Sequence, residues 1–202
     1  LFFLVCALFP LYLLIIKSVK NVGQDQMDPF TPTFPFLWDN YRVAWLNISS
    51  NILNSFIITS IALAGLVALA CVTAFAFVHF KFYLKEVLFT AIIALMMIPG
   101  TLTLVSQYSM VYSMRLVNTY WGVILPQMMA AFPMSFFLLT SFFKGISREL
   151  FDAASLDGAP DMTMLFKIML PLSMPIVATI VMTQFMALWN EYVWSGLILI
   201  TD

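Results

Sequence analysis

The sequence predicts an all-α, polytopic membrane helix bundle, and three observations lead to this fold class. Hydrophobic residues make up 62% of the 202 residues and charged residues only 9%, whereas about a quarter of a soluble domain is charged. The apolar residues gather in runs, and a helix needs about 20 such residues to cross a bilayer. These runs lack the alternating polarity of a spanning strand. The chain therefore needs lipid as part of its solvent and crosses that lipid as helices.

Five apolar runs are candidates for spanning helices. They cover residues 1–16, 52–78, 87–105, 120–143 and 172–200. The first is slightly short, as we expect if the start of the chain cuts a first spanning helix. Because the chain begins inside one run and ends just after another, we expect a single transmembrane domain over residues 1–202 that is truncated at both ends. Five spanning helices are thus expected here.

Prolines subdivide three of these runs. Pro99 and Gly100 interrupt the third, Pro126 and Pro133 lie in the fourth, and Pro175 lies near the start of the fifth. A membrane helix tolerates such breaks where neighbouring helices or water satisfy the freed carbonyl groups. Each proline alone predicts an ordinary kink, and together they favour a bundle that lines a cavity.

The loops between the runs differ in charge. Residues 17–50 form an irregular segment of polar, aromatic and proline residues, which we expect to lie over the membrane surface. Positive residues favour the cytoplasmic side, and counting them on alternate loops gives five against four. The five are Lys81, Lys85, Lys144, Arg148 and Lys167, and the four are Lys17, Lys20, Arg42 and Arg115. This small excess favours a cytoplasmic position for the loop at residues 144–171.

The sequence lacks the motifs of enzymatic, metal and nucleotide sites. There is one histidine, and HExxH, CxxC, GxSxG and GxxxxGK[ST] motifs are absent. Cys6 and Cys71 lie far apart within apolar runs, as buried thiols do, and a net charge of −1 does not indicate a nucleic-acid surface. We therefore expect no catalytic residue, no metal site and no bound cofactor. Any ATP would be bound by another chain.

The loop at residues 144–171 has the rhythm of two short helices, and it reads KGISRELFDAASLDGAPDMTMLFKIMLP. Ser147 can cap the first helix and Gly158 can end it. Pro160 suits the first turn of a second helix, which Pro171 would delimit before the next span. The apolar residues of the first helix fall on one side, and they are Leu150, Phe151 and Ala154. We expect both helices to lie at the membrane surface.

This loop resembles the cytoplasmic signature of the binding-protein-dependent ABC importer permeases. That signature is Glu-Ala-Ala, three residues, Gly, nine residues, then Ile-x-Leu-Pro. The chain keeps every spacing, with aspartate in place of the glutamate, at Asp152, Ala153, Ala154, Gly158, Ile168, Leu170 and Pro171. The resemblance implies that residues 144–171 are a cytoplasmic loop that docks onto an ATPase subunit. It also implies six spanning helices, of which the last lies outside this chain.

Further residues are similar to the carbohydrate-uptake branch of that family, of the type of the second permease subunit for maltose. They are Asn54-Ser55, Ile98-Pro99 and Trp189-Asn190-Glu191-Tyr192. The resemblance implies import of a sugar or oligosaccharide across the plasma (inner) membrane of a prokaryote. The implied partners are nucleotide-binding ATPase subunits, a second and non-identical permease subunit, and an extracytoplasmic solute-binding protein.

Two candidate sites have competing interpretations. Asp152 is either a contact to a basic residue of the ATPase or a solvated loop charge. Glu191, the only ionisable residue inside an apolar run, either lines the solute path with Trp189 and Asn190 or lies in an interfacial aromatic belt. Three alternatives to a sugar importer remain open: a permease for another solute, an ion-coupled secondary transporter, and a membrane-embedded enzyme.

Overall fold

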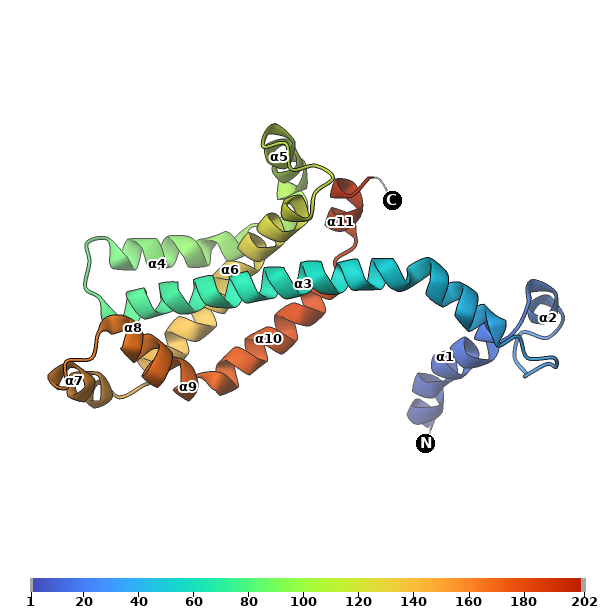
Figure 1. Ribbon diagram of the computed structural model, residues 1–202, viewed down its shortest axis with the longest axis horizontal. Helices are drawn as coiled ribbons and strands as arrows, with labels where there is room; N and C mark the ends of the chain where they lie inside the picture. The colour runs from blue at the N-terminus through green and yellow to red at the C-terminus, as the bar shows by residue number, and fades with distance from the viewer. Residues whose placement is uncertain (1, 201–202) are drawn as a thin grey trace. The chain divides into compact units, whose positions relative to one another are not determined.

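A computed structural model describes residues 2–200, except for the side chain of Arg148. Every regular element in that range is a helix (Figure 1), so the all-α prediction is confirmed. The chain divides into two compact units, Leu1–Asn54 and Ser55–Asp202. The long helix α3 (Asp39–His79) begins in the first unit and continues through the second.

The first unit holds α1 (Phe2–Ser18), α2 (Val22–Met27) and the start of α3. A capping box begins α2, because the Asn21 side chain accepts from the Gln24 amide and the Gln24 side chain accepts from the Asn21 amide. The segment between α1 and α3 is thus more regular than the sequence predicted. The prolines of this segment end at Pro35, and residues 39–79 contain no proline, so α3 starts well before the predicted span at residue 52.

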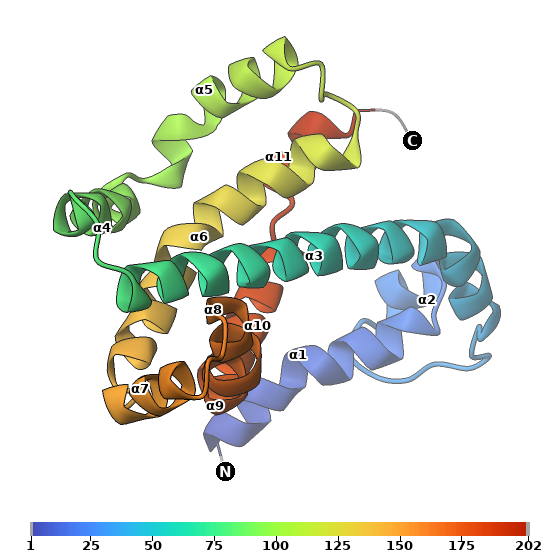
Figure 2. The same ribbon diagram turned by 60° about the vertical axis from the view of Figure 1, so that its left-hand side comes forward.

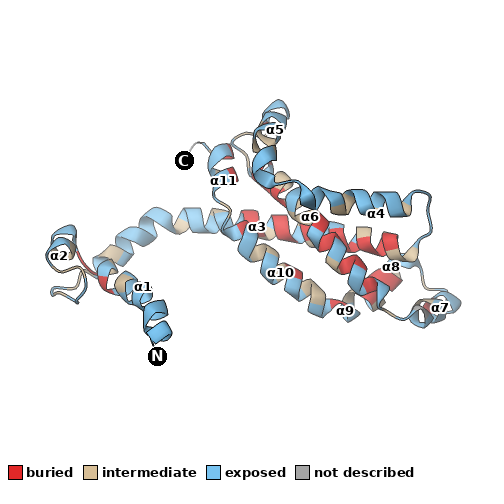
Figure 3. Ribbon diagram, turned by 180° about the vertical axis from the view of Figure 1, so that it is seen from behind, coloured by how far each residue is buried: buried red, intermediate tan, exposed pale blue. Residues whose placement is uncertain are grey.

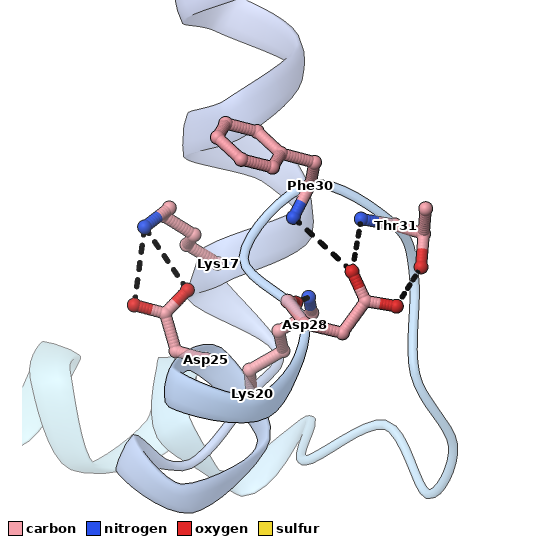
Figure 4. A network of polar contacts seen from close by, with 6 residues as sticks. All are labelled: Lys17, Lys20, Asp25, Asp28, Phe30 and Thr31. Atoms are coloured by element: carbon pink, nitrogen blue, oxygen red, sulfur yellow. Dashed lines mark hydrogen bonds and ion pairs between the residues drawn. The ribbon is translucent and has the colours of Figure 1, made fainter.

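Polar contacts hold the irregular turn after α2 (Figure 4). Lys17 of α1 pairs with Asp25 of α2 at 3.0 Å between Nζ and Oδ1. The Asp28 carboxylate accepts hydrogen bonds from the Thr31 hydroxyl, the Thr31 amide and the Phe30 amide. These bonds, led by the one from the Thr31 hydroxyl, hold the pKa of Asp28 below its ordinary value.

The second unit is built around α6 (Tyr120–Lys144). This helix contacts α4 (Lys85–Ala94), α5 (Gly100–Ser113), α10 (Met174–Trp189) and α11 (Val193–Ile198). It also packs against α3, where the rings of Phe77 and Phe136 have centroids 5.0 Å apart. The signature loop contains α7 (Arg148–Leu156), α8 (Asp161–Met164), a π-helical turn (Leu165–Met169) and α9 (Leu170–Leu172). Figure 2 shows α7, α8 and α9 together at one end of this unit, with α11 and the far end of α5 at the other.

Buried residues lie along α3 and α6 (Figure 3), and they form two clusters. The first joins the C-terminal part of α3 and the C-terminal part of α6 to the signature loop and α10. The second joins the middle of α3 and the start of α6 to α5, the end of α10 and α11. The outward sides of the helices are apolar and exposed, as expected for helices that face lipid.

The spanning helices are less regular than the five runs suggested. By length and composition α3 and α6 can each cross a membrane unbroken, whereas two further candidates among the described residues are bent pairs and α1 is a shorter apolar helix. The third predicted span bends by 104° between Met97 and Gly100. Proline forces the preceding residue out of the helical region, and Ile98 is accordingly extended, with ψ 114°. The break follows from Pro99.

The fifth predicted span is also divided. The division follows Trp189, where α10 ends, and three residues separate it from the start of α11 at Val193. A bend of 75° between Leu172 and Met174 marks the start of this span, where it follows the last helix of the loop at residues 144–171. In contrast, Pro126 and Pro133 lie within the continuous helix α6. Proline content alone therefore did not predict where a helix breaks.

The turn after α2 gives a pH-dependent prediction. A carboxylate with a lowered pKa stabilises the folded turn above its ordinary pKa, and this stabilisation is lost as the pH falls through the lowered value. We expect hydrogen exchange at Phe30 and Thr31, corrected for intrinsic rates, to accelerate below about pH 4. Asp28→Asn should show fast exchange at neutral pH already. Asp39→Asn is the matched control, and equal protection in wild type and Asp28→Asn would contradict the prediction.

Candidate docking loop and solute path

The first signature helix, α7, begins and ends as the sequence predicted. The Ser147 hydroxyl accepts from the Glu149 amide at 3.3 Å. At the other end Gly158 adopts a positive φ of 73°, which a residue with a side chain rarely adopts. The Gly158 amide donates to the Ser155 carbonyl and the Ala159 amide donates to the Ala154 carbonyl, both at 3.0 Å. These two bonds form a Schellman motif, so the glycine fixes the direction of the chain after α7.

The side chains of α7 divide between the bundle and the surface. Ala154 is buried and Phe151 packs against the first buried cluster. Asp152 and Ala153 are exposed, which leaves the start of the signature free to meet another molecule. Leu150, which the sequence placed on the same apolar side of the helix, is 46% exposed.

The second half of the signature holds the loop to the bundle. Ile168 and Leu170 are partly buried and pack against the first cluster, while Pro171 is exposed. Pro160 immediately precedes α8 as its N-cap. Pro171, however, does not end the second helix, because the chain remains helical to Leu172.

The helix continues past Pro171 because of the turn before it. Proline cannot donate to the carbonyl four residues earlier, which is that of Lys167. This carbonyl lies within the π-helical turn Leu165–Met169, where bonds span five residues instead of four. The missing bond thus falls where the α-helical pattern is already interrupted, and the actual break comes at Ser173.

A polar contact also joins the loop to α3. His79 Nε2 lies 3.2 Å from Asp161 Oδ1, at the start of α8. The imidazole ring stacks on Phe75, with centroids 4.9 Å apart and planes inclined by 10°. The histidine that the sequence placed at the end of a span therefore connects that span to the signature loop.

The three candidate solute-path residues lie at the junction of α10 and α11. Trp189 is the last residue of α10, and its ring stacks on Phe185 with centroids 5.6 Å apart. The Asn190 side chain donates to the Met186 carbonyl at 2.7 Å, which caps the end of α10. Glu191 then begins the turn into α11. The three residues therefore lie where α10 ends and the chain turns into α11.

The Glu191 carboxylate is half-buried and accepts three hydrogen bonds. Oε1 accepts from the Trp194 amide at 2.8 Å. Oε2 accepts from the Ser195 amide and from Gln127 Nε2, each at 3.3 Å. A carboxylate is favourable at a helix N-terminus, so Glu191 stabilises the start of α11 and ties it to α6. Neither interpretation of Glu191 included this arrangement.

Sequence reasoning missed the partners of this junction on α6. Pro126 lacks an amide hydrogen, so the Gly122 carbonyl has no donor within its own helix. The indole Nε1 of Trp194 donates to that carbonyl at 3.1 Å and supplies the missing bond. Gln127 is buried, and its Oε1 has no hydrogen-bond partner among the described residues. A proline four residues after a glycine was the one local signal for this contact.

The docking loop and the Glu191 junction are not brought together. They lie at opposite ends of the second unit (Figure 1). The helix α10, Met174–Trp189, connects them, and its 16 residues span about 24 Å. A movement at one end must therefore pass through helices to reach the other.

Comparison with known proteins finds the same family that the loop at residues 144–171 resembles. Residues 33–201 match the family described as binding-protein-dependent transport system inner membrane component. The chain belongs to this family. Three relatives are similar over nearly the whole chain. The diacetylchitobiose uptake system permease protein NgcG of Streptomyces coelicolor is 30% identical over 93% of this chain and 63% of its own length. The sn-glycerol-3-phosphate transport system permease protein UgpE of Pectobacterium atrosepticum is 30% identical over 96% and 72%.

The third relative is the probable ABC transporter permease protein YurM of Bacillus subtilis. It is 32% identical over 96% of this chain and 65% of its own length. The chain thus spans roughly two thirds of the length of these permeases. Membership of an inner-membrane transport family accounts for the apolar helices and identifies the chain as a transporter component.

The close packing around Gly122 at the start of α6 gives a stability prediction. A Cβ atom at Gly122 would lie 2.2 Å from the Leu116 carbonyl oxygen and 3.0 Å from Ile198. Gly122→Ala should therefore destabilise the protein by about 1–3 kcal/mol, as overpacking does. The matched control is Gly196→Ala in α11, where a Cβ meets nothing within 4 Å. The measurement is thermal unfolding in detergent, and equal midpoints for the two variants would contradict this packing.

Proposed function

We propose that this chain is the transmembrane permease subunit of an ABC importer that translocates a sugar or oligosaccharide by alternating access. The observation that carries the proposal is the geometry of the signature loop. Its first half presents Asp152, Ala153 and Gly158 on the surface, and its second half packs Ile168 and Leu170 into the bundle. One half is available to a partner, while the other transmits the partner's movement to the spanning helices.

ATP hydrolysis in this proposal takes place in a partner subunit, and the chain itself binds no cofactor. Closure of two ATPase subunits would displace α7, and the buried cluster would carry that displacement to the ends of α3 and α6. The solute-binding protein would deliver solute to the other end of the bundle. A second, non-identical permease subunit would complete the path in the inner membrane of a prokaryote.

The proposed solute is a carbohydrate, with one specific alternative. NgcG is named for uptake of diacetylchitobiose and UgpE for transport of sn-glycerol-3-phosphate. Both are polyhydroxylated, and the junction of Trp189, Asn190 and Glu191 offers the stacking and hydrogen-bonding groups that such molecules need. The carboxylate of Glu191 favours a neutral sugar over a phosphate ester, because it would repel an anion.

The experiment for this function uses the full-length importer. The tagged chain is co-purified with its ATPase and second permease subunit and reconstituted into liposomes with the solute-binding protein. We expect ATPase activity to rise with an oligosaccharide and not with sn-glycerol-3-phosphate. If only sn-glycerol-3-phosphate stimulates the ATPase, that phosphate ester is the solute in place of a sugar. Failure to recover any ATPase subunit with the chain would overturn the proposal.

Gly158 tests the docking surface separately from the fold. A Cβ there meets nothing within 4 Å, although φ is 73°. Asparagine tolerates a positive φ, so Gly158→Asn keeps the turn while adding a side chain to the proposed interface. We expect it to lower solute-stimulated ATPase activity several-fold, and Gly158→Leu to lower it further through backbone strain of about 1–2 kcal/mol.

Gly100→Asn is the matched control. Gly100 lies outside the signature loop, and a Cβ there also meets nothing within 4 Å. All variants are compared at equal membrane levels. Wild-type coupling in Gly158→Asn and Gly158→Leu would remove this glycine from the docking surface.

Glu191 tests the solute path. In the proposed solute path the Glu191 carboxylate also accepts a hydrogen bond from a solute hydroxyl. Glu191→Gln removes the charge from this bond, and a hydrogen bond to a charged group is worth about 1.5–3 kcal/mol. We expect the half-saturation concentration of uptake to rise about ten-fold or more, measured with saturating solute-binding protein. Gln127→Leu removes one of the three bonds and leaves the α11 contacts of Glu191. Unchanged half-saturation in Glu191→Gln and Glu191→Ala would limit the residue to a structural role.

A further inference from the structure

A cavity lies at the signature-loop end of the bundle, apart from the Glu191 junction. Its volume is about 520 Å³, and its lining comes from the end of α3, the α3–α4 turn, the start of α4, the end of α6, α7 and the π-helical turn. The charged groups that line it are Lys81, Lys85 and Lys144 with Glu86 and Asp152. Buried side chains of Phe143 and Met169 form an apolar floor. The cavity thus combines ammonium groups with an apolar base.

The three ammonium groups are not neutralised within the described part of the chain. None of them lies within 4.0 Å of a carboxylate oxygen in residues 2–200. Lys85 donates to the Phe80 carbonyl at 3.0 Å, and Lys144 lies 4.8 Å from the centroid of the Phe89 ring. Each ammonium has three donor hydrogens, so both lysines keep donors for a further acceptor. Three positive charges face two negative ones, so the cavity favours an anion.

His79 also lines the cavity, but its contact with Asp161 occupies Nε2.

The surroundings of the cavity suit lipid more than a free ion. The neighbouring residues Leu84 and Leu88 are 50% and 46% exposed, and Tyr83 is 88% exposed. Apolar and aromatic side chains beside basic ones are typical of the membrane interface. Basic pockets between spanning helices on the cytoplasmic side bind lipid headgroups.

We propose that Lys81, Lys85 and Lys144 bind the phosphate of an anionic membrane phospholipid, with phosphatidylglycerol as the representative headgroup. The lipid would lie with its phosphate in the cavity and its acyl chains along the exposed side chains of α4. The headgroup would then bridge the α3–α4 turn to the end of α6, beside the signature loop. The inference rests on the proposed function only in placing this end of the bundle at the cytoplasmic membrane surface.

The test measures lipid binding directly and does not depend on transport. The importer with its assembled subunits is purified in detergent, and binding of phosphatidylglycerol, phosphatidylethanolamine and phosphatidylcholine is compared by native mass spectrometry. We expect phosphatidylglycerol to bind most tightly. Each of Lys81→Gln, Lys85→Gln and Lys144→Gln should weaken it about five-fold, the effect of one lysine near a lipid surface. The triple variant should lose it almost completely.

Two matched controls separate the cavity from general charge. Lys167→Gln removes a positive charge from an exposed position of the signature loop that does not line the cavity, and it should leave binding unchanged. Glu86→Gln should leave binding unchanged or tighten it, because it removes repulsion. Co-purification of the ATPase with each variant verifies that the bundle is intact.

Three results would overturn the proposal. The first is equal retention of phosphatidylglycerol by wild type and the triple variant. The second is preference for phosphatidylethanolamine, or complete displacement of lipid by millimolar glycerophosphoglycerol, since a mixed-charge headgroup or a free phosphate would then be the ligand. The third is binding of phosphatidylglycerol by the chain purified without its ATPase but not by the assembled importer, which would mean that the partner covers the cavity. If the importer still shows solute-stimulated ATPase activity, any of these results would overturn the lipid site but not the proposed function.

Discussion

The packing of the signature loop against α3 and α6 is the constraint on which the rest of the structure depends. Phe143, Leu165 and Met169 are almost completely buried where α6 meets the π-helical turn. A close-packed interior transmits a displacement because it contains few voids to absorb it. In the proposed function, the exposed residues of α7 would therefore meet a partner while its other side moves with the spanning helices.

The second constraint is that every backbone break within the apolar part needs a compensating hydrogen bond. Pro126 frees the Gly122 carbonyl, and the Trp194 indole donates to it. The junction of α10 and α11 frees amide groups, and the Glu191 carboxylate accepts from two of them. The bond from the Trp194 indole and the bond from Gln127 to Glu191 join this junction to α6. A charged residue within an apolar run therefore has a structural role here before any role toward solute.

Local rules predicted the parts of the fold that depend on neighbouring residues. Ser147 and Gly158 begin and end α7 through contacts within five residues, and such contacts are visible in sequence. The break at Pro99 likewise follows from the geometry of one dipeptide. The family signature also located the loop, because its spacing is a property of the sequence alone.

Contacts between distant residues were beyond the same reasoning. Gln127 and Glu191 are 64 positions apart, and His79 and Asp161 are 82 apart. Their meeting depends on how α6, α10 and the signature loop pack. The expectation that Pro171 ends a helix failed for the same reason, because a proline rule does not include the π-helical turn that precedes it. The sequence also did not predict the start of α3 at Asp39, because residues 39–51 are mostly polar and aromatic although they contain no proline.

The claim that the signature loop and the ends of α3 and α6 move as one body is the one to test most directly. Spin labels at Leu156 of α7 and Tyr83 of the α3–α4 turn are suitable, because their side chains are 89% and 88% exposed, with Cys6 and Cys71 replaced beforehand. The distance distribution between the labels is measured by double electron–electron resonance in the assembled importer, without nucleotide and with trapped ATP. The account predicts one narrow distribution that is the same in both states. A shift larger than the width of that distribution would show that the loop moves independently of the helices.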